Sequence, residues 1–298
     1  MEKSKNKVSA KETQHLGNTV AVGVDGSDGS SNALELVVED FHRKGLDKII
    51  VIHITNEKKD HEKGVQYHSK SVYNKHHEYL KSHLNENDYE FVFEEQTENV
   101  GVFEQINNIA ESKKADLLVF GFRGVNGSKN RPDELSKGIK YLVHKPAIPC
   151  LVVKEKTHRS YRKEGGFKWL VCIESAESKS FKAFTHCLRL VDAENDIIHG
   201  FSVDMNDGKS KKVEELFNEQ CKKNEIKNFN FDTVSLGDKK VVKDVIHSWI
   251  TEHLKNENHF LDFVVMGYNS SKYNFNREAE NTTVDLLKDV LCNVFFDH

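Results

Sequence analysis

The chain has 298 residues, about twice the size of a typical domain, so we expect two domains with a hydrophobic core each. Its formal net charge is -4, and the basic residues alternate with acidic ones throughout, which argues against nucleic acid as the main partner. The five cysteines show no CxxC spacing, and no apolar stretch reaches the roughly 20 residues of a membrane helix. We therefore expect buried, reduced thiols and a cytoplasmic protein that does not enter a membrane.

The N-terminal part begins with a polar segment and continues as strand, turn and helix. Residues 1–17 are rich in lysine and lack the apolar core of a signal peptide, so we interpret them as a flexible tail. The sequence TVAVGVD, residues 19–25, is followed by apolar residues at helical spacing between positions 33 and 41. Residues 48–55, KIIVIHIT, form a continuous apolar, β-branched run, which is typical of a parallel strand buried on both faces.

The rest of the first half alternates in the same way. We expect helices within residues 72–84, 102–110 and 135–143, and strands at 89–93, 115–121 and 150–153. Strands that alternate with helices of this length indicate right-handed βαβ crossovers and a mostly parallel sheet. The following segment KEKTHRSYRKEGG, residues 154–166, is basic and ends in two glycines. We interpret it as a solvated linker, with a charged docking patch as the alternative.

After this linker the same order of strands and helices starts again, which indicates an internal repeat. Three pairs set the register: Asp25 with Glu174 at an offset of 149 residues, His53 with His199 at 146, and Gly121 with Gly267 at 146.

The predicted fold class is α/β. We expect two tandem, doubly wound, five-stranded parallel sheets with helices on both faces, in domains at residues 18–154 and 167–298 that the linker 155–166 connects.

Ligands of open parallel sheets bind outside the carboxyl ends of the strands, where the strand order reverses. The first strand ends at Asp25 and continues into a turn of small residues, which starts at Gly26 and lets a ligand approach the helix that follows. The fourth strand ends in GFRG, where Gly121 and Gly124 allow backbone N–H groups to point at an anion. These two loops are the predicted binding site.

These residues resemble the universal stress protein family, over about the whole chain as two copies. The resemblance is carried by VAVGVDGSDGS, IHIT, ADLLVFGFRG and KYLVHKPAIPCLVVK. It implies that Asp25 contacts the adenosine part of a nucleotide and that Ile54 lines the adenine pocket. It also implies that a motif G-x2-G-x9-G-(S/T), which begins here at Gly121 and Gly124, surrounds the ribose and phosphates. The nucleotide-binding residues that follow from it are Asp25, Gly26, Ile54, Gly121, Gly124, Ser136 and Lys137.

The end of this motif departs from the family pattern. The third glycine and its hydroxyl partner fall on Ser136 and Lys137, and eleven residues, 125–135, follow Gly124 where the family has nine. Ser136 can cap a helix, and Lys137 can meet a phosphate through its charge. Further cations lie nearby in the sequence: Arg123, Lys129 and Arg131. The alternative is that the loop has diverged and holds no triphosphate. A Gly124→Asp substitution is expected to abolish nucleotide binding with little effect on stability.

The second copy departs further. Glu174 and Ser175 replace the Asp-Gly pair, and GYNS, residues 267–270, replaces the GxxG loop, so the backbone cannot approach a pyrophosphate as glycines allow. We expect a structural copy without a nucleotide site. The resemblance implies that the last strands, CLVV at 150–153 and NVFF at 293–296, pair and form an intramolecular pseudo-dimer.

Other candidate sites are weaker. His76 and His83 lie two helical turns apart, roughly 10 Å, so they cannot share a zinc ion, and we predict no metal site. His53 is interpreted as a structural histidine. The serines of the first turn are interpreted as helix caps and not as nucleophiles: Ser27, Ser30 and Ser31. We find no general acid and base pair, so no catalytic residue is predicted and turnover is expected to be slow or absent.

Two main hypotheses about function remain at this point, and an enzyme that acts on nucleotides is a third alternative. The first is a universal stress protein-like regulator that binds an adenine nucleotide in the first domain, either AMP or ATP with its Mg. The alternative is a nucleotide-independent scaffold, or a structural subunit of a larger assembly, which binds protein partners through the second domain or the N-terminal tail.

Overall fold

The structure is a computed structural model that describes nine segments of the chain: residues 17–56, 64–124, 135–154, 165–175, 177–204, 210–236, 242–254, 261–267 and 282–297. Most of the predicted tail and of the predicted linker lies outside these segments. Within them, no helix has both the length and the apolar character that a membrane crossing requires.

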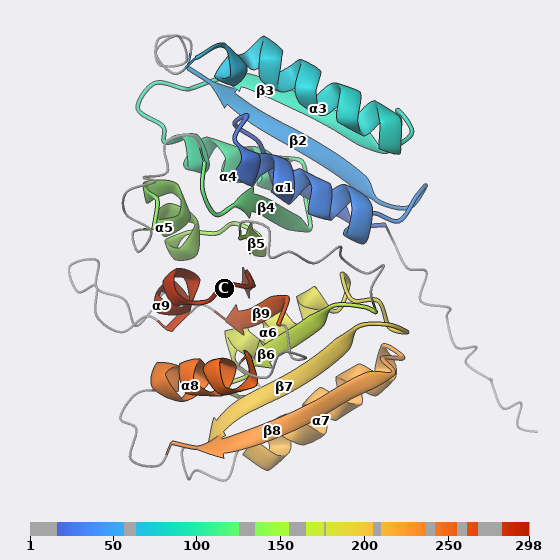
Figure 1. Ribbon diagram of the computed structural model, residues 1–298, viewed down its shortest axis with the longest axis vertical. Helices are drawn as coiled ribbons and strands as arrows, with labels where there is room; N and C mark the ends of the chain where they lie inside the picture. Colours follow the sequence, from blue (N-terminus) through green and yellow to red (C-terminus); the bar gives the residue numbers. More distant parts are fainter. Residues whose placement is uncertain are drawn as a thin grey trace, which may run out of the picture.

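One sheet of ten strands runs through the molecule in the order β3-β2-β1-β4-β5-β10-β9-β6-β7-β8 (Figure 1). The strands of the first half are β1 (Thr19–Gly23), β2 (Lys48–Thr55), β3 (Tyr89–Glu95), β4 (Leu117–Gly121) and β5 (Cys150–Val153). Those of the second half are β6 (Lys168–Cys172), β7 (Ile197–Asp204), β8 (Asn228–Ser235), β9 (Phe263–Gly267) and β10 (Asn293–Asp297). All pairs within a half are parallel. The α/β fold with a doubly wound set of five parallel strands in each half is therefore confirmed.

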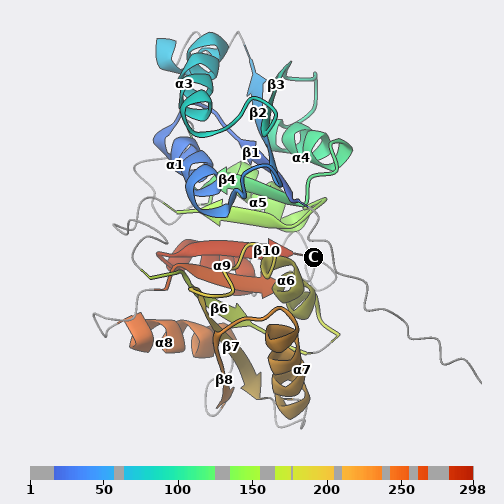
Figure 2. The same ribbon diagram turned by 90° about the vertical axis from the view of Figure 1, so that its right-hand side faces the viewer.

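The two sets of strands are joined into one sheet by an antiparallel strand pair, β5 with β10, in which Leu151 lies opposite Phe295. This is the pairing of last strands that the pseudo-dimer predicts. Figure 2 shows β10 at the junction between the halves, with the C-terminus at its end.

The helices alternate with the strands as expected. In the first half they are α1 (Asp28–Leu36), the π-helical turn η1 (Val37–Phe41), the 3-10 turn η2 (Val65–Tyr67), α3 (Ser69–His83), α4 (Val102–Ser112) and α5 (Lys137–His144). In the second half they are α6 (Lys179–Cys187), α7 (Ser210–Lys223), α8 (Val242–Leu254) and α9 (Thr282–Asp289). Apolar residues of α1, α3, α6 and α7 belong to one hydrophobic cluster, and those of α4, α5, α8 and α9 belong to another.

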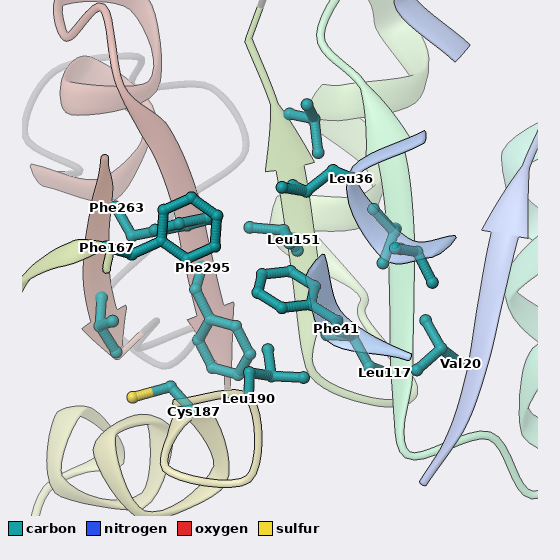
Figure 3. Close-up of a cluster of buried hydrophobic side chains, with 14 of the residues drawn as sticks. Val20, Leu36, Phe41, Leu117, Leu151, Phe167, Cys187, Leu190, Phe263 and Phe295 are labelled. Atoms are coloured by element: carbon teal, nitrogen blue, oxygen red, sulfur yellow. The ribbon is translucent and has the colours of Figure 1, made fainter. Parts of the chain in front are cut away.

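Each of these clusters runs through both halves, so the expectation of a separate core for each domain is wrong. The reason is the β5–β10 pair, which makes both faces of the sheet continuous across the junction. Phe41 of the first half lies beside Leu151 and Phe295 (Figure 3). Its ring centroid is 6.0 Å from that of Phe167 and 5.8 Å from that of Phe263, both in the second half.

The internal repeat is visible in how the central strand of each half begins. The backbone amide of Asn18 donates to the carboxylate of Asp47 at 2.6 Å, and the amide of Phe167 donates to Asp196 at 2.8 Å. Both pairs are 29 residues apart in the sequence. A buried aspartate therefore satisfies the same backbone donor in both halves.

One predicted pair of the repeat is wrong. The β1–β2 and β6–β7 pairings share one register, with an offset of 149 residues that relates Thr19 to Lys168 and Lys48 to Ile197. His53 therefore corresponds to Ser202 and not to His199. His199 lies three residues earlier on β7, where its Nε2 is 3.0 Å from Asp232 and its ring centroid is 4.6 Å from that of Trp249.

All five cysteines are buried and free. Burial raises the pKa of Cys172, Cys221 and Cys292 to about 12, so their thiols stay protonated at neutral pH. This agrees with the interpretation of the cysteines as buried, unreactive core residues.

Candidate functional site

A pocket of about 210 Å³ lies where the carboxyl ends of β1 and β4 separate. The chain leaves β1 for β2 on one side and reaches β4 on the other side. This reversal is the feature that opens a crevice for ligands in doubly wound sheets. The apolar part of its wall includes Val24, Ile54, Val102, Phe103, Ile106 and Phe120. Its polar part includes Asp25, Ser30, His53, Asn56, Gln96, Arg123 and Ser136.

The carboxylate of Asp25 is held in place at the start of α1. Its Oδ1 accepts hydrogen bonds from the backbone amide of Ser27 at 3.1 Å and from the Ser27 hydroxyl at 2.5 Å. The same hydroxyl caps α1, because it accepts from the amide of Ser30 at 3.2 Å. The cap therefore fixes the orientation of Asp25, and the interpretation of the first-turn serines as capping residues is confirmed for Ser27.

The glycines allow the two loops of the site to touch. A Cβ atom at Gly121 would lie 2.3 Å from the carbonyl carbon of Gly29, and one at Gly29 would lie 2.2 Å from the carbonyl oxygen of Arg123. A Cβ atom at Gly124 would lie 2.4 Å from Oδ2 of Asp25. Gly124→Asp would therefore displace the Asp25 carboxylate, which is the end of a side chain and not backbone. The expectation that this substitution has little effect on stability stays a prediction.

The structure brings five of the seven predicted residues to this pocket: Asp25, Ile54, Gly121, Gly124 and Ser136. Gly26 has a positive φ of 82° and packs against the carbonyl oxygen of Gln66 instead. Lys137 begins α5, but its side chain lies outside the described part of the chain, as do Lys129 and Arg131. Ser136 caps α5, since its hydroxyl accepts from the amide of Ile139 at 3.2 Å.

Sequence reasoning missed several residues of the wall. Asn56 and Gln96 follow β2 and β3, and the Asn56 amide donates to the Gln96 side-chain oxygen at 2.7 Å. Phe103 comes from α4, with its ring centroid 5.3 Å from that of Phe120. The rule that carboxyl ends of parallel strands share one edge could have identified Asn56 and Gln96. No local signal identifies Phe103, because its position depends on how α4 packs.

Two histidines lie near Asp25. His53 is 4% exposed, and its Nδ1 lies 2.9 Å from the carbonyl oxygen of Val24, so it is a structural histidine that also lines the pocket. His76 of α3 is 2% exposed. Burial, with the charges of Lys75 and His53, lowers the pKa of His76 to about 4 against the opposing effect of Asp25. His76 is therefore neutral at physiological pH.

The corresponding position of the second half is built from different groups. The amide of Glu174 donates to the hydroxyl of Ser180 at 2.9 Å, and Ser178 caps α6. A Cβ atom at Gly267 would lie 2.0 Å from the amide nitrogen of Ser180, so this glycine serves the packing of α6 against β9. Residues 268–270, where the loop differs most from GxxG, lie outside the described segments. The absence of a nucleotide site in this half stays a prediction.

Comparisons with known proteins identify one family and one fold. Residues 18–154 match the family model described as the universal stress protein family. A search of curated protein sequences finds no significant match.

Solved structures with the same fold extend over nearly the whole chain. A universal stress protein from Archaeoglobus fulgidus DSM 4304 is 14% identical, with a TM-score of 0.61 and coverage of 95% of this chain and 96% of that chain. A functionally unknown protein from Pseudomonas aeruginosa PAO1 is 12% identical, with a TM-score of 0.58 and coverage of 95% and 92%. A universal stress protein in complex with cAMP is 19% identical and covers 47% of this chain and 98% of its own, with a TM-score of 0.34.

Proposed function

Residues 18–154 belong to the universal stress protein family, and on this basis we propose that the pocket between the ends of β1 and β4 binds an adenine nucleotide, AMP or ATP. The observation that carries the proposal is that one pocket is lined by an acidic residue, an apolar residue and a basic residue: Asp25, Ile54 and Arg123. These groups suit a ribose, a base and a phosphate. The protein then acts as a regulator whose state depends on nucleotide occupancy.

The apolar wall provides a surface for a flat base. Ile54, Ile106 and Phe120 are at most 8% exposed, yet all three line the pocket. The pocket volume of about 210 Å³ is below the roughly 300–1,000 Å³ of drug-sized ligand sites. We therefore place the base and ribose inside, and the phosphates at the open side near Arg123.

Asp25 is suited to bind the ribose. Its orientation is set by the capping residue Ser27, so it needs little reorganisation to accept a hydrogen bond from a ribose hydroxyl group. Hydrogen bonds to a charged group contribute roughly 1.5–3 kcal/mol.

We propose binding without efficient hydrolysis. Among the described residues that line the pocket, Asp25 is the only carboxylate, so this part of the site offers neither a general acid and base pair nor a second acidic ligand for Mg. ATP would bring its Mg ion with it.

Isothermal titration calorimetry of the full chain with adenosine, AMP and Mg-ATP tests the proposal. Asp25→Asn should raise the Kd of all three at least tenfold, because a charge-assisted hydrogen bond becomes a neutral one. Asp28→Asn is the matched control. It removes one negative charge, as Asp25→Asn does, but Asp28 lies three residues away and is exposed at the start of α1. Arg123→Gln should weaken AMP and Mg-ATP and leave adenosine unchanged.

Two results would count against the proposal. Wild-type affinity in Asp25→Asn would refute the assignment of the site. No heat of binding for any of the three ligands at millimolar concentration would refute nucleotide binding itself and favour the scaffold alternative.

A further inference from the structure

Lys154 is buried, although it opens a basic segment that the sequence predicts to be a solvated linker. Lys154 directly follows the last residue of β5 and is 9% exposed. Its Nζ lies 3.4 Å from the ring centroid of Phe122 and donates a hydrogen bond to the carbonyl oxygen of Leu287. Its backbone amide donates to Oδ1 of Asn293 at 2.9 Å. A buried ammonium group requires such partners to offset the loss of water.

These partners come from both halves of the molecule. Leu287 is in the last turn of α9 and Asn293 begins β10, so both belong to the second half. Phe122 belongs to the first half and directly follows β4. The carbonyl groups of a helix's last turn and the face of an aromatic ring both carry partial negative charge, which suits an ammonium group. Lys154 therefore connects α9 to the loop after β4.

That loop is part of the candidate nucleotide site. Gly121, Arg123 and Gly124 line the pocket, whereas Phe122 is not among the residues that line it. The backbone amide of Phe122 donates to the carbonyl oxygen of Val153, next to Lys154, at 2.8 Å. The loop also has little freedom on its other side, because a Cβ atom at Gly121 would lie 2.3 Å from the backbone of α1. A small displacement of Phe122 would therefore change the pocket.

We propose that Lys154 is a positioning residue through which the second half holds the loop of residues 121–124 in the geometry that binds nucleotide. This inference rests on the proposed function and adds to it that the affinity of the first half depends on contacts made by α9 and β10. The second half then supports the site of the first half without a glycine loop of its own.

The charges around Lys154 are consistent with this role. Burial lowers the pKa of Lys154 to about 8. The charge of Arg123 lowers this pKa further, whereas Cys292 and Asp289 raise it. The ammonium form still predominates at pH 7. A phosphate bound near Arg123 would reduce the repulsion between these two cations.

The first test compares three full-length variants by calorimetry with AMP. Lys154→Met keeps most of the length of the side chain but removes the charge and the donor, and it should raise the Kd about tenfold, or about 1.4 kcal/mol. Lys154→Arg keeps a cation above the ring and should restore most of the affinity. Lys48→Met is the control, since Lys48 is 45% exposed and pairs with Glu90 on the surface, and its Kd should stay within twofold of wild type.

A double-mutant cycle separates a direct connection from general destabilisation. Phe122→Leu keeps an apolar side chain and removes the aromatic face. If Lys154 acts through Phe122, the double variant should bind AMP only about as weakly as the worse single variant. Additive losses would overturn the inference. Far-UV circular dichroism checks that each variant is folded. If Lys154→Met does not fold, the cycle is measured with Lys154→Arg and Phe122→Leu instead.

Amide hydrogen exchange without ligand gives a readout that does not depend on nucleotide binding. The amide of Phe122 should exchange at least tenfold faster in Lys154→Met than in wild type, with the amides of β7 unchanged. If wild type binds no nucleotide, the proposed function fails, and the exchange rates still decide whether Lys154 holds the loop. If wild type binds AMP and Lys154→Met matches it in both affinity and exchange, the inference is overturned and the proposed function stands.

Discussion

Replacement of Phe41 by alanine should destabilise both halves of the protein, although Phe41 lies in the first half. Phe41 is 6% exposed, and its ring centroid lies within 6.3 Å of those of Phe167, Trp169 and Phe263 in the second half. Loss of a buried phenylalanine side chain costs about 3–5 kcal/mol. Because aromatic neighbours contribute about 0.5–1.5 kcal/mol each beyond the area they bury, we expect a loss of about 4 kcal/mol.

Urea unfolding with two signals tests this prediction. The chain has two tryptophans, Trp169 and Trp249, and both lie in the second half. Because the ring centroid of Trp169 is 6.3 Å from that of Phe41, their fluorescence reports on the second half and on its junction with the first. Far-UV circular dichroism reports on the whole chain. Phe41→Ala should lower the urea midpoint of both signals. A fluorescence midpoint that stays at the wild-type value while the dichroism midpoint falls would refute the shared core.

A double-mutant cycle measures the contact itself. Phe41→Ala combined with Phe263→Leu should cost less than the sum of the single losses by about 0.5–3 kcal/mol, as for residues in contact. Phe91→Ala is the control. Phe91 lies on the outer strand β3 and packs on Tyr73 at a centroid distance of 4.9 Å, so its combination with Phe263→Leu should be additive. Additivity in the Phe41 cycle would contradict the packing at the junction.

Three further predictions concern the surroundings of the site. Between pH 6.5 and about 4 the unfolded chain binds a proton at His76 that the folded chain does not bind. The free energy of unfolding should therefore fall by about 3 kcal/mol as the pH falls over this range. His76→Gln should remove this pH dependence, which urea titrations measure. Gly121→Ala should lower the free energy of unfolding by about 1–3 kcal/mol through overpacking. Gly101→Ala is the control, because Gly101 has a φ of -68° and a Cβ atom there would lie no closer than 3.9 Å to another residue's side chain. Thermal unfolding should show a change of less than about 1 kcal/mol for this control. Ser27→Ala and Ser178→Ala should each cost about 1 kcal/mol as lost helix caps, but calorimetry should show weaker AMP binding only for Ser27→Ala.

Much of the fold follows from local patterns in the sequence. Residues 48–55 form β2 with the predicted bounds, because a continuous β-branched run is typical of a strand that is buried on both faces. The end of β1 and the end of β4 are marked by a carboxylate and by glycines that follow apolar runs. The order of such strands and helices determines which loops share an edge of the sheet, so it predicted Asp25 and Gly121 as neighbours at one pocket.

The tertiary structure decided which face and which environment a side chain occupies. The three-residue error in the pairing of His53 with His199 assigns the histidine to the wrong face, since side chains alternate along a strand and an odd shift reverses them. Lys154 shows the same limit for burial. The residues that follow it in the sequence are polar and basic, and its burial depends on Leu287 and Asn293, which lie 133 and 139 residues away. Local composition determines where a chain can form a strand, but contacts between distant segments determine which charged side chains are buried away from water.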